Sequence, residues 1–196
     1  MKIILYLATA CLALFACSQA EKQQSQPTRD EVLVNKGLKV LSDTNVKEKD
    51  EALAAFKEAC QLGNNYGCHK TGIAYNNGLY GLDKDYQQAN QWYLLAAGKG
   101  YIPSQQNIAN LHAYRLLQNL NDIEGYKWLK LAEDATQKCL PGTIEASSGI
   151  NDAERRRLCQ LASTGQGRLR SIFRKRMSKH EIQQAEQLAN NWQARQ

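Results

Sequence analysis

The chain has 196 residues, 43% of them hydrophobic, and a formal net charge of +6. This length is sufficient for one domain with a sizeable core. The sequence contains no Ser-x-x-Lys, no Gly-x-Ser-x-Gly and no phosphate-cradling glycine loop, which excludes the enzyme and nucleotide-binding classes that those motifs define.

Residues 1–16 predict an export signal. Lys2 precedes an apolar run from Ile3 to Ala16, which is too short for a membrane span of about 20 residues. Removal of this segment leaves about 180 residues for the mature chain. We therefore expect an exported protein.

The signal ends in Leu-Phe-Ala-Cys at positions 14–17, which resembles the bacterial lipobox. This resemblance implies cleavage before Cys17 and attachment of lipid to that cysteine. Ser18 in the next position implies the outer membrane, where the protein would face the periplasm or the cell surface. The alternative is a soluble secreted protein cut near Ala16 or Ala20.

Residues 17–30 predict a flexible tether. The segment is rich in Gln, Ser and Lys and nearly free of apolar side chains. It cannot bury enough surface to fold, so it would link the membrane to a domain over residues 31–196.

The cysteines of the mature domain predict two disulfide bonds. Cys11 lies in the signal and Cys17 is assigned to lipid, which leaves an even set in an oxidising compartment: Cys60, Cys68, Cys139 and Cys159. Four cysteines allow three pairings, and we choose the one that is local in sequence. One continuous helix would part Cys60 and Cys68 by about 12 Å, beyond the reach of a disulfide, so the chain must turn between them.

A zinc site is the rival explanation of these cysteines. Zinc sites use close Cys-x-x-Cys or His-x-x-x-His spacing, and the sequence has neither. The histidines, His69, His112 and His180, lie scattered along the chain. We therefore expect no metal and no cofactor.

Internal repetition dominates the sequence from residue 31 onward. A shift of 37 positions brings Phe56 onto Tyr93, and a further shift of 36 brings Trp92 onto Trp128. Each unit has apolar residues at helical spacing, followed by a glycine that can end the first helix. Such short helices are marginal alone, so stacking of the units must stabilise them.

The segments DYQQANQWYLLAAGKG and DIEGYKWLKLAEDA resemble the first helix of Sel1-like repeats, a branch of the tetratricopeptide-like α-solenoids. The resemblance implies an all-α fold, a short right-handed α/α solenoid of helix-turn-helix repeats with a C-terminal capping helix. The repeats would cover residues of about 51–86, 87–122 and 123–176. A helix over residues 31–41 would cover the N-terminal end of the stack.

The third repeat departs from the pattern because residues 136–165 form an insertion. Asn151 and Glu154 could cap a helix that runs to about Ala162, and a Cys139–Cys159 bridge would fasten that helix to the third repeat. After the insertion, Ser178 and Glu181 stand at capping-box spacing and predict a capping helix over residues 179–194.

The resemblance implies a non-enzymatic function. Sel1-like proteins are commonly adaptors, whose concave surface would here hold an unknown envelope protein or peptide. The Cys60–Cys68 spacing is also similar to the cysteine-rich Sel1-like secreted proteins, for which β-lactam binding and hydrolysis have been proposed. Binding or hydrolysis of β-lactams is therefore the alternative function.

His69 beside Cys68 could suggest a thiol nucleophile with its base. An oxidised sulfur cannot be a nucleophile, so we interpret His69 as a solvent-facing histidine next to a disulfide.

Positive charge gathers late in the chain. An exported protein meets little nucleic acid, so we expect no nucleic-acid partner. The cationic face could instead approach an acidic partner or an anionic surface, and the alternative is a solvated helix face. The residues that would form this face are Arg155, Arg156, Arg157, Arg174 and Arg176, with Arg168, Arg170 and Lys175 nearby.

Overall fold

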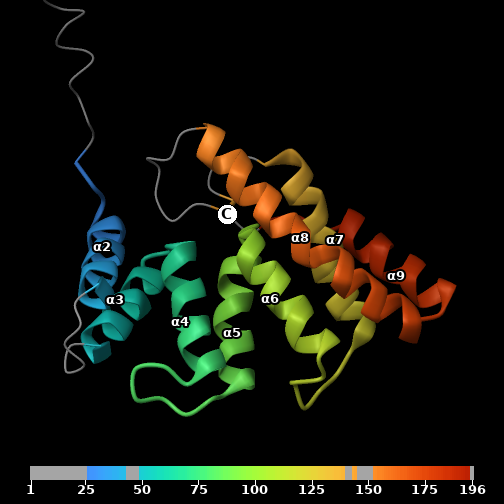
Figure 1. Cartoon of the computed structure of the whole chain (residues 1–196), viewed down its shortest axis with the longest axis horizontal. Helices are drawn as coiled ribbons and strands as arrows, with labels where there is room; N and C mark the ends of the chain where they lie inside the picture. Colours follow the sequence, from blue (N-terminus) through green and yellow to red (C-terminus); the bar gives the residue numbers. More distant parts are fainter. Residues whose placement is uncertain (1–25, 43–48, 140–142, 145–151, 195–196) are drawn as a thin grey trace, which may run out of the picture.

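The computed structural model describes residues 26–42, 49–139, 143–144 and 152–194 of the chain. These residues form eight α-helices and no strand, which confirms the all-α prediction (Figure 1). The helices are α2 (Arg29–Ser42), α3 (Lys49–Gln61), α4 (Asn65–Asn77), α5 (Tyr86–Ala97), α6 (Ile102–Ala113), α7 (Asp122–Lys138), α8 (Asp152–Arg176) and α9 (Lys179–Asn190).

The helices stack in chain order. Each helix from α2 to α7 packs against the next one, α8 packs against both α6 and α7, and α9 packs against α7. Figure 1 shows α2 and α3 at one end of the stack and α9 at the other. The pairs α3–α4, α5–α6 and α7–α8 are the three repeats, and α2 covers α3 at the N-terminal end as predicted.

Short polar side chains begin the helices and glycines reverse the chain between them. Asn64, Asp85 and Asn121 each accept a backbone hydrogen bond at the start of α4, α5 and α7 respectively. Gly63 and Gly100 lie in the turns that follow the first helix of repeats one and two, with φ of 94° and 87°. These left-handed angles suit glycine, and the two positions are related by the shift of 37.

The repeat frame also locates the core. Phe56, Tyr93 and Leu129 occupy matching positions, and each is no more than 1% exposed. Three alanines at a second matching position have no exposed surface: Ala59, Ala96 and Ala132. The recurring large and small residues therefore interlock between helices, and burial of this surface stabilises helices that are marginal alone.

The structure corrects the predicted boundaries of the insertion helix and of the tether. The expected insertion helix does not end near Ala162, because α8 continues without a break to Arg176. Its buried side extends through Cys159, Leu169 and Phe173, and this packing outweighs the modest helix penalty of Gly167. At the other end, α2 begins at Arg29, so the predicted tether over residues 17–30 overlaps the first helix.

The capping helix begins where it was predicted, although α9 ends at Asn190 and not at residue 194. The Ser178 side chain accepts a hydrogen bond from the Glu181 backbone, and the Glu181 side chain accepts one from the Ser178 backbone. This reciprocal pair is the capping box that the spacing indicated. Ala185 and Ala189 then face the core, and α9 takes the place that a fourth repeat would fill.

Candidate functional site

A disulfide joins the two helices of the first repeat. Cys60 of α3 and Cys68 of α4 are bonded across the turn, with their Cα atoms 4.6 Å apart. Both cysteines are buried, and the partly buried Tyr66 and Trp92 pack against them. The bond therefore fastens the helix pair at its turn, and Trp92 packs against it.

In the second repeat, a hydrogen bond lies at the position that corresponds to the disulfide of the first repeat. The shift of 37 puts Ala97 and Gln105 at the positions of Cys60 and Cys68. The Gln105 Nε2 donates to the Ala97 carbonyl oxygen at 3.3 Å, and Gln105 is 1% exposed. A side-chain amide thus joins α5 to α6 where a disulfide joins α3 to α4.

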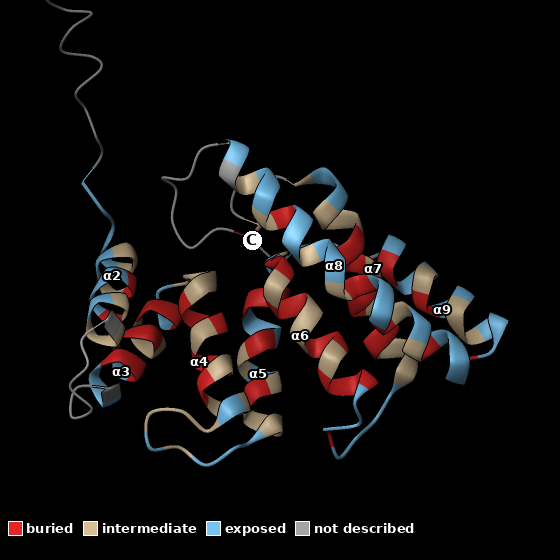
Figure 2. Cartoon of the chain, in the orientation of Figure 1, coloured by how far each residue is buried: buried red, intermediate tan, exposed pale blue. Residues whose placement is uncertain are grey.

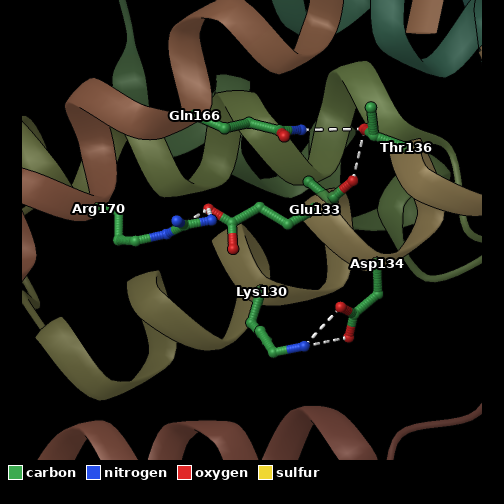
Figure 3. A network of polar contacts seen from close by, with 7 residues as sticks. Lys130, Glu133, Asp134, Thr136, Gln166 and Arg170 are labelled. Carbon is green, nitrogen blue, oxygen red and sulfur yellow. Dashed lines mark hydrogen bonds and ion pairs between the residues drawn. The ribbon is translucent and has the colours of Figure 1, made fainter. Parts of the chain in front are cut away.

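An ion pair holds the third repeat. The shift of 36 puts Glu133 at the position of Ala97, and its carboxylate accepts a hydrogen bond from Arg170 Nε of α8 at 3.0 Å (Figure 3). Burial raises the pKa of Glu133, and the guanidinium of Arg170 opposes that shift. Beside the pair, Gln166 Nε2 donates to Thr136 Oγ1 at 3.0 Å. A disulfide, an amide hydrogen bond and an ion pair therefore link the paired helices at the matching positions of the three repeats.

A second disulfide links α7 to the first half of α8. Cys139 and Cys159 are bonded, with their Cα atoms 6.1 Å apart. Cys139 ends α7 with φ of 46°, so the bond lies directly at the end of that helix. Both disulfides join the cysteines that are nearest in sequence, which is the pairing chosen above.

Replacing Cys60 and Cys68 together by alanine should lower the free energy of unfolding by about 2.5 kcal/mol, because the short loop no longer restricts the unfolded chain. Urea unfolding of the variant and the parent protein measures the difference. Thiol titration of the unreduced protein should detect no free thiol at the four bonded cysteines. Unchanged stability in the double variant would contradict a stabilising bridge.

His69 lies inside the core, which corrects its interpretation as a solvent-facing residue. It is 8% exposed, and its Nδ1 is 3.0 Å from the Oγ of the fully buried Ser104 on α6. The rings of Tyr93 and Tyr101 lie 5.7 and 5.2 Å from the imidazole. Burial lowers the pKa of His69 to about 3. The imidazole is therefore neutral near pH 7 and joins α4 to α6.

The pair of Ser104 and His69 has the residue types of a nucleophile and its base. Ser104 has no exposed surface, however, and neither residue lines the grooves described below. A substrate carbonyl cannot approach the hydroxyl in this packing. The contact therefore acts as a structural hydrogen bond in this conformation.

His112 and Trp128 are also structural. His112 Nδ1 accepts a hydrogen bond from the Asn121 backbone at 3.3 Å, and burial lowers the pKa of this histidine. Trp128 donates to Glu124 at 2.7 Å and meets Trp192 edge to face. Within the described ranges no cluster of His, Cys, Asp and Glu could hold a metal ion.

A polar groove of about 590 Å³ lies between α7 and α8. Its walls include the disulfide of Cys139 and Cys159, and Arg156, Gln160 and Ser163 line it from α8. The ion pair of the third repeat lies within the same lining. The groove thus follows the contacts that fasten α8 to α7.

A second groove, of about 460 Å³, lies on the other side of α7. Leu131 and Ala135 of α7 face Trp192, which follows α9, and Lys99 and Lys138 contribute cations. The groove therefore combines an apolar wall with charged residues, a composition that suits a polypeptide ligand. We refer to it as the α7–α9 groove.

The predicted cationic face is only partly available. Arg176 donates to the Ala113 carbonyl oxygen and to Asp122, both at 2.7 Å, so folding uses its charge inside the molecule. Arg176 is therefore less available to an external partner than an unpaired arginine would be. Arg170 is likewise paired with Glu133. The exposed cationic residues of α8 include Arg156, Arg168, Arg174 and Lys175.

Two of the predictions about the membrane fall outside the structure. Cys17 and the export signal belong to residues 1–25, which are not among the described residues. Among the helices that are described, none has the length and apolar character needed to cross a bilayer.

No family model and no curated protein matches the sequence. A solved structure is nevertheless similar: the crystal structure of c5321, a protective antigen of uropathogenic Escherichia coli strains that displays an SLR (Sel1-like repeat) fold. The TM-score is 0.62 over 89% of this chain. The chain has the Sel1-like repeat fold. The sequence identity is 21%, and the match spans 31% of the antigen's chain, so the similarity concerns the fold alone.

The Sel1-like repeat fold explains why the contacts between helices recur at fixed positions. A stack of this kind presents an extended surface. Sequence reasoning missed Gln105 and Glu133 as partners of Ala97 and Arg170. The repeat frame could have found both, because it aligns them with the cysteines of the first bridge.

Proposed function

We propose that the protein is a non-enzymatic scaffold of the bacterial envelope, anchored by lipid at Cys17, that holds a protein or peptide partner. The observation that carries the proposal is the α7–α9 groove on a Sel1-like repeat fold. Its apolar wall of Leu131 and Trp192 excludes water from a ligand, and the nearby Lys99 and Lys138 select the register and charge of that ligand.

A photo-crosslinking amino acid in place of Lys138 tests the groove directly. In envelopes, it should give the same crosslinked partner in independent preparations. The same amino acid in place of the exposed Lys84 is the matched control, because the loop between α4 and α5 lies at the opposite end of the helices (Figure 1). Equal crosslinking at both positions, or none at either, counts against the groove.

The anchor has its own test. Replacing Cys17 by serine should move the protein from the membrane fraction to the soluble fraction, because a serine cannot carry the lipid thioether. Anchoring raises the local concentration of the domain at the envelope, which favours binding there. An unchanged distribution after fractionation would show that the protein is not anchored through Cys17.

The scaffold proposal also predicts a result for β-lactams. The purified protein should hydrolyse nitrocefin no faster than its Ser104→Ala variant, since the hydroxyl of Ser104 is sealed in the core against His69. Hydrolysis that exceeds this control would favour the enzymatic alternative and would require an opening between α4 and α6.

A further inference from the structure

The basic character of α8 is not explained by folding. The sequence from Arg155 to Arg176 contains eight basic residues and no acidic one. Folding pairs at least two of these charges with carboxylates, since Arg170 pairs with Glu133 at 2.7 Å and Arg176 pairs with Asp122 at 2.7 Å. The exposed side of α8 keeps its positive charge.

Four cationic residues and one apolar residue define a continuous surface on α8. Helical geometry places all five side chains within about a quarter turn of the direction opposite the buried Leu169 and Phe173. Figure 2 shows exposed residues along this outer side of the helix. We call this surface the α8 ridge, and it consists of Arg156, Leu161, Arg168, Arg174 and Lys175.

The composition of the α8 ridge distinguishes between two kinds of partner. Protein interfaces concentrate aromatic side chains, together with Arg, around an apolar centre. No exposed residue of the described part of α8 is aromatic. The exposed apolar side chain of the ridge is Leu161, with 57% of its surface accessible. Charges of one sign spread along about 28 Å of helix match an extended anionic surface better than a protein epitope.

We propose that the α8 ridge docks the domain onto the anionic phospholipid headgroups of the membrane. Each cation near such a surface strengthens binding roughly fivefold. The inference rests on the proposed anchor at Cys17, because about 11 residues separate that cysteine from α2 and allow at most about 40 Å of extended chain. The domain is therefore held where the α8 ridge can meet the headgroups.

Sedimentation with vesicles tests this proposal without the anchor. The mature chain, residues 17–196, carrying Cys17→Ser is mixed with vesicles of phosphatidylethanolamine and phosphatidylglycerol, or with neutral phosphatidylcholine vesicles. Binding to the anionic vesicles should be at least about tenfold stronger and should weaken as salt is added. The neutral vesicles report any adhesion that does not depend on charge. Equal binding to both would overturn the proposal.

Paired charge reversals locate the effect. Arg168→Glu with Lys175→Glu should weaken binding to anionic vesicles by at least about 30-fold. Lys36→Glu with Lys84→Glu changes the net charge equally but lies away from α8, and it should leave binding within about threefold. An equal loss in both double variants would show that net charge, not the α8 ridge, is responsible.

Two further results complete the test. Circular dichroism checks that the reversed variant is folded, and Arg168→Gln with Lys175→Gln replaces it if it is not. Crosslinking of α8 to an acidic protein, without preference for anionic vesicles, would overturn the lipid assignment. Because the vesicles measure the protein without lipid, failure here is distinct from failure of the anchor or the α7–α9 groove.

Discussion

Replacing Gly125 by alanine should lower the free energy of unfolding by about 3 kcal/mol. A Cβ at this position would lie 2.5 Å from the Cβ of His112 on α6 and 2.8 Å from the ring of Phe173 on α8. The His112 Cβ is fixed to the backbone, so it cannot turn aside. Relief of the overlap requires α7 to move away from both neighbours, which separates the packed core between them.

The matched control is Gly167→Ala. This glycine lies in α8, is exposed, and would have no neighbour within 4 Å of an added Cβ. Alanine favours the helix over glycine, so the variant should be more stable than the parent by about 0.5–1 kcal/mol. Urea unfolding measures both. Changes of the same sign in the two variants would show that helix propensity, not packing, determines the effect of the Gly125 substitution on the free energy of unfolding.

Most of the fold could be predicted because the repeats carry the same physical pattern several times. The shift that aligns Phe56 with Tyr93 identifies residues that are both buried, and the turn glycines Gly63 and Gly100 repeat at the same interval. Short-range sequence patterns also allowed correct predictions. The spacing of Ser178 and Glu181 predicted the cap of α9, because that contact spans a single helical turn.

The rest depends on contacts between distant residues that no local pattern reveals. His69 appears exposed from its place beside a turn, yet Ser104 and two tyrosines enclose it from the next repeat. Arg176 belongs to a run of cations, and its partner Asp122 is 54 positions away. The length of α8 could not be predicted from the sequence either, because packing against α6 and α7 determines which of its residues are buried.

The contacts between paired helices show where sequence variation is tolerated in this stack. A disulfide, an amide hydrogen bond and an ion pair occupy matching places in the three repeats. Each contact spans the same short gap between two helices. The absence of a cysteine pair at the matching places of repeats two and three therefore need not weaken the stack, because other side chains form the link there.

Lowering the pH from about 8 to about 5 should destabilise the protein by about 2 kcal/mol through His69 alone. Burial holds the pKa of this histidine at about 3 in the folded state, and the positive charge of Lys70 acts in the same direction. In the unfolded chain the imidazole takes up a proton near its ordinary pKa of about 6.5. The unfolded state therefore binds more protons between these two values, and the contribution of His69 is lost as the pH falls through that range.

His69→Asn isolates this contribution. The amide of asparagine can replace the Nδ1 contact with Ser104 but does not titrate, whereas His112 and the carboxylates titrate in both proteins. Urea unfolding should find the parent more stable near pH 8, because its imidazole fills the space between Tyr93 and Tyr101. The difference between the two proteins should shrink by about 2 kcal/mol near pH 5 and by roughly 4 kcal/mol near pH 3.5. A difference that stays constant with pH would mean that the imidazole becomes protonated in the folded protein, with α4 and α6 parting to admit water.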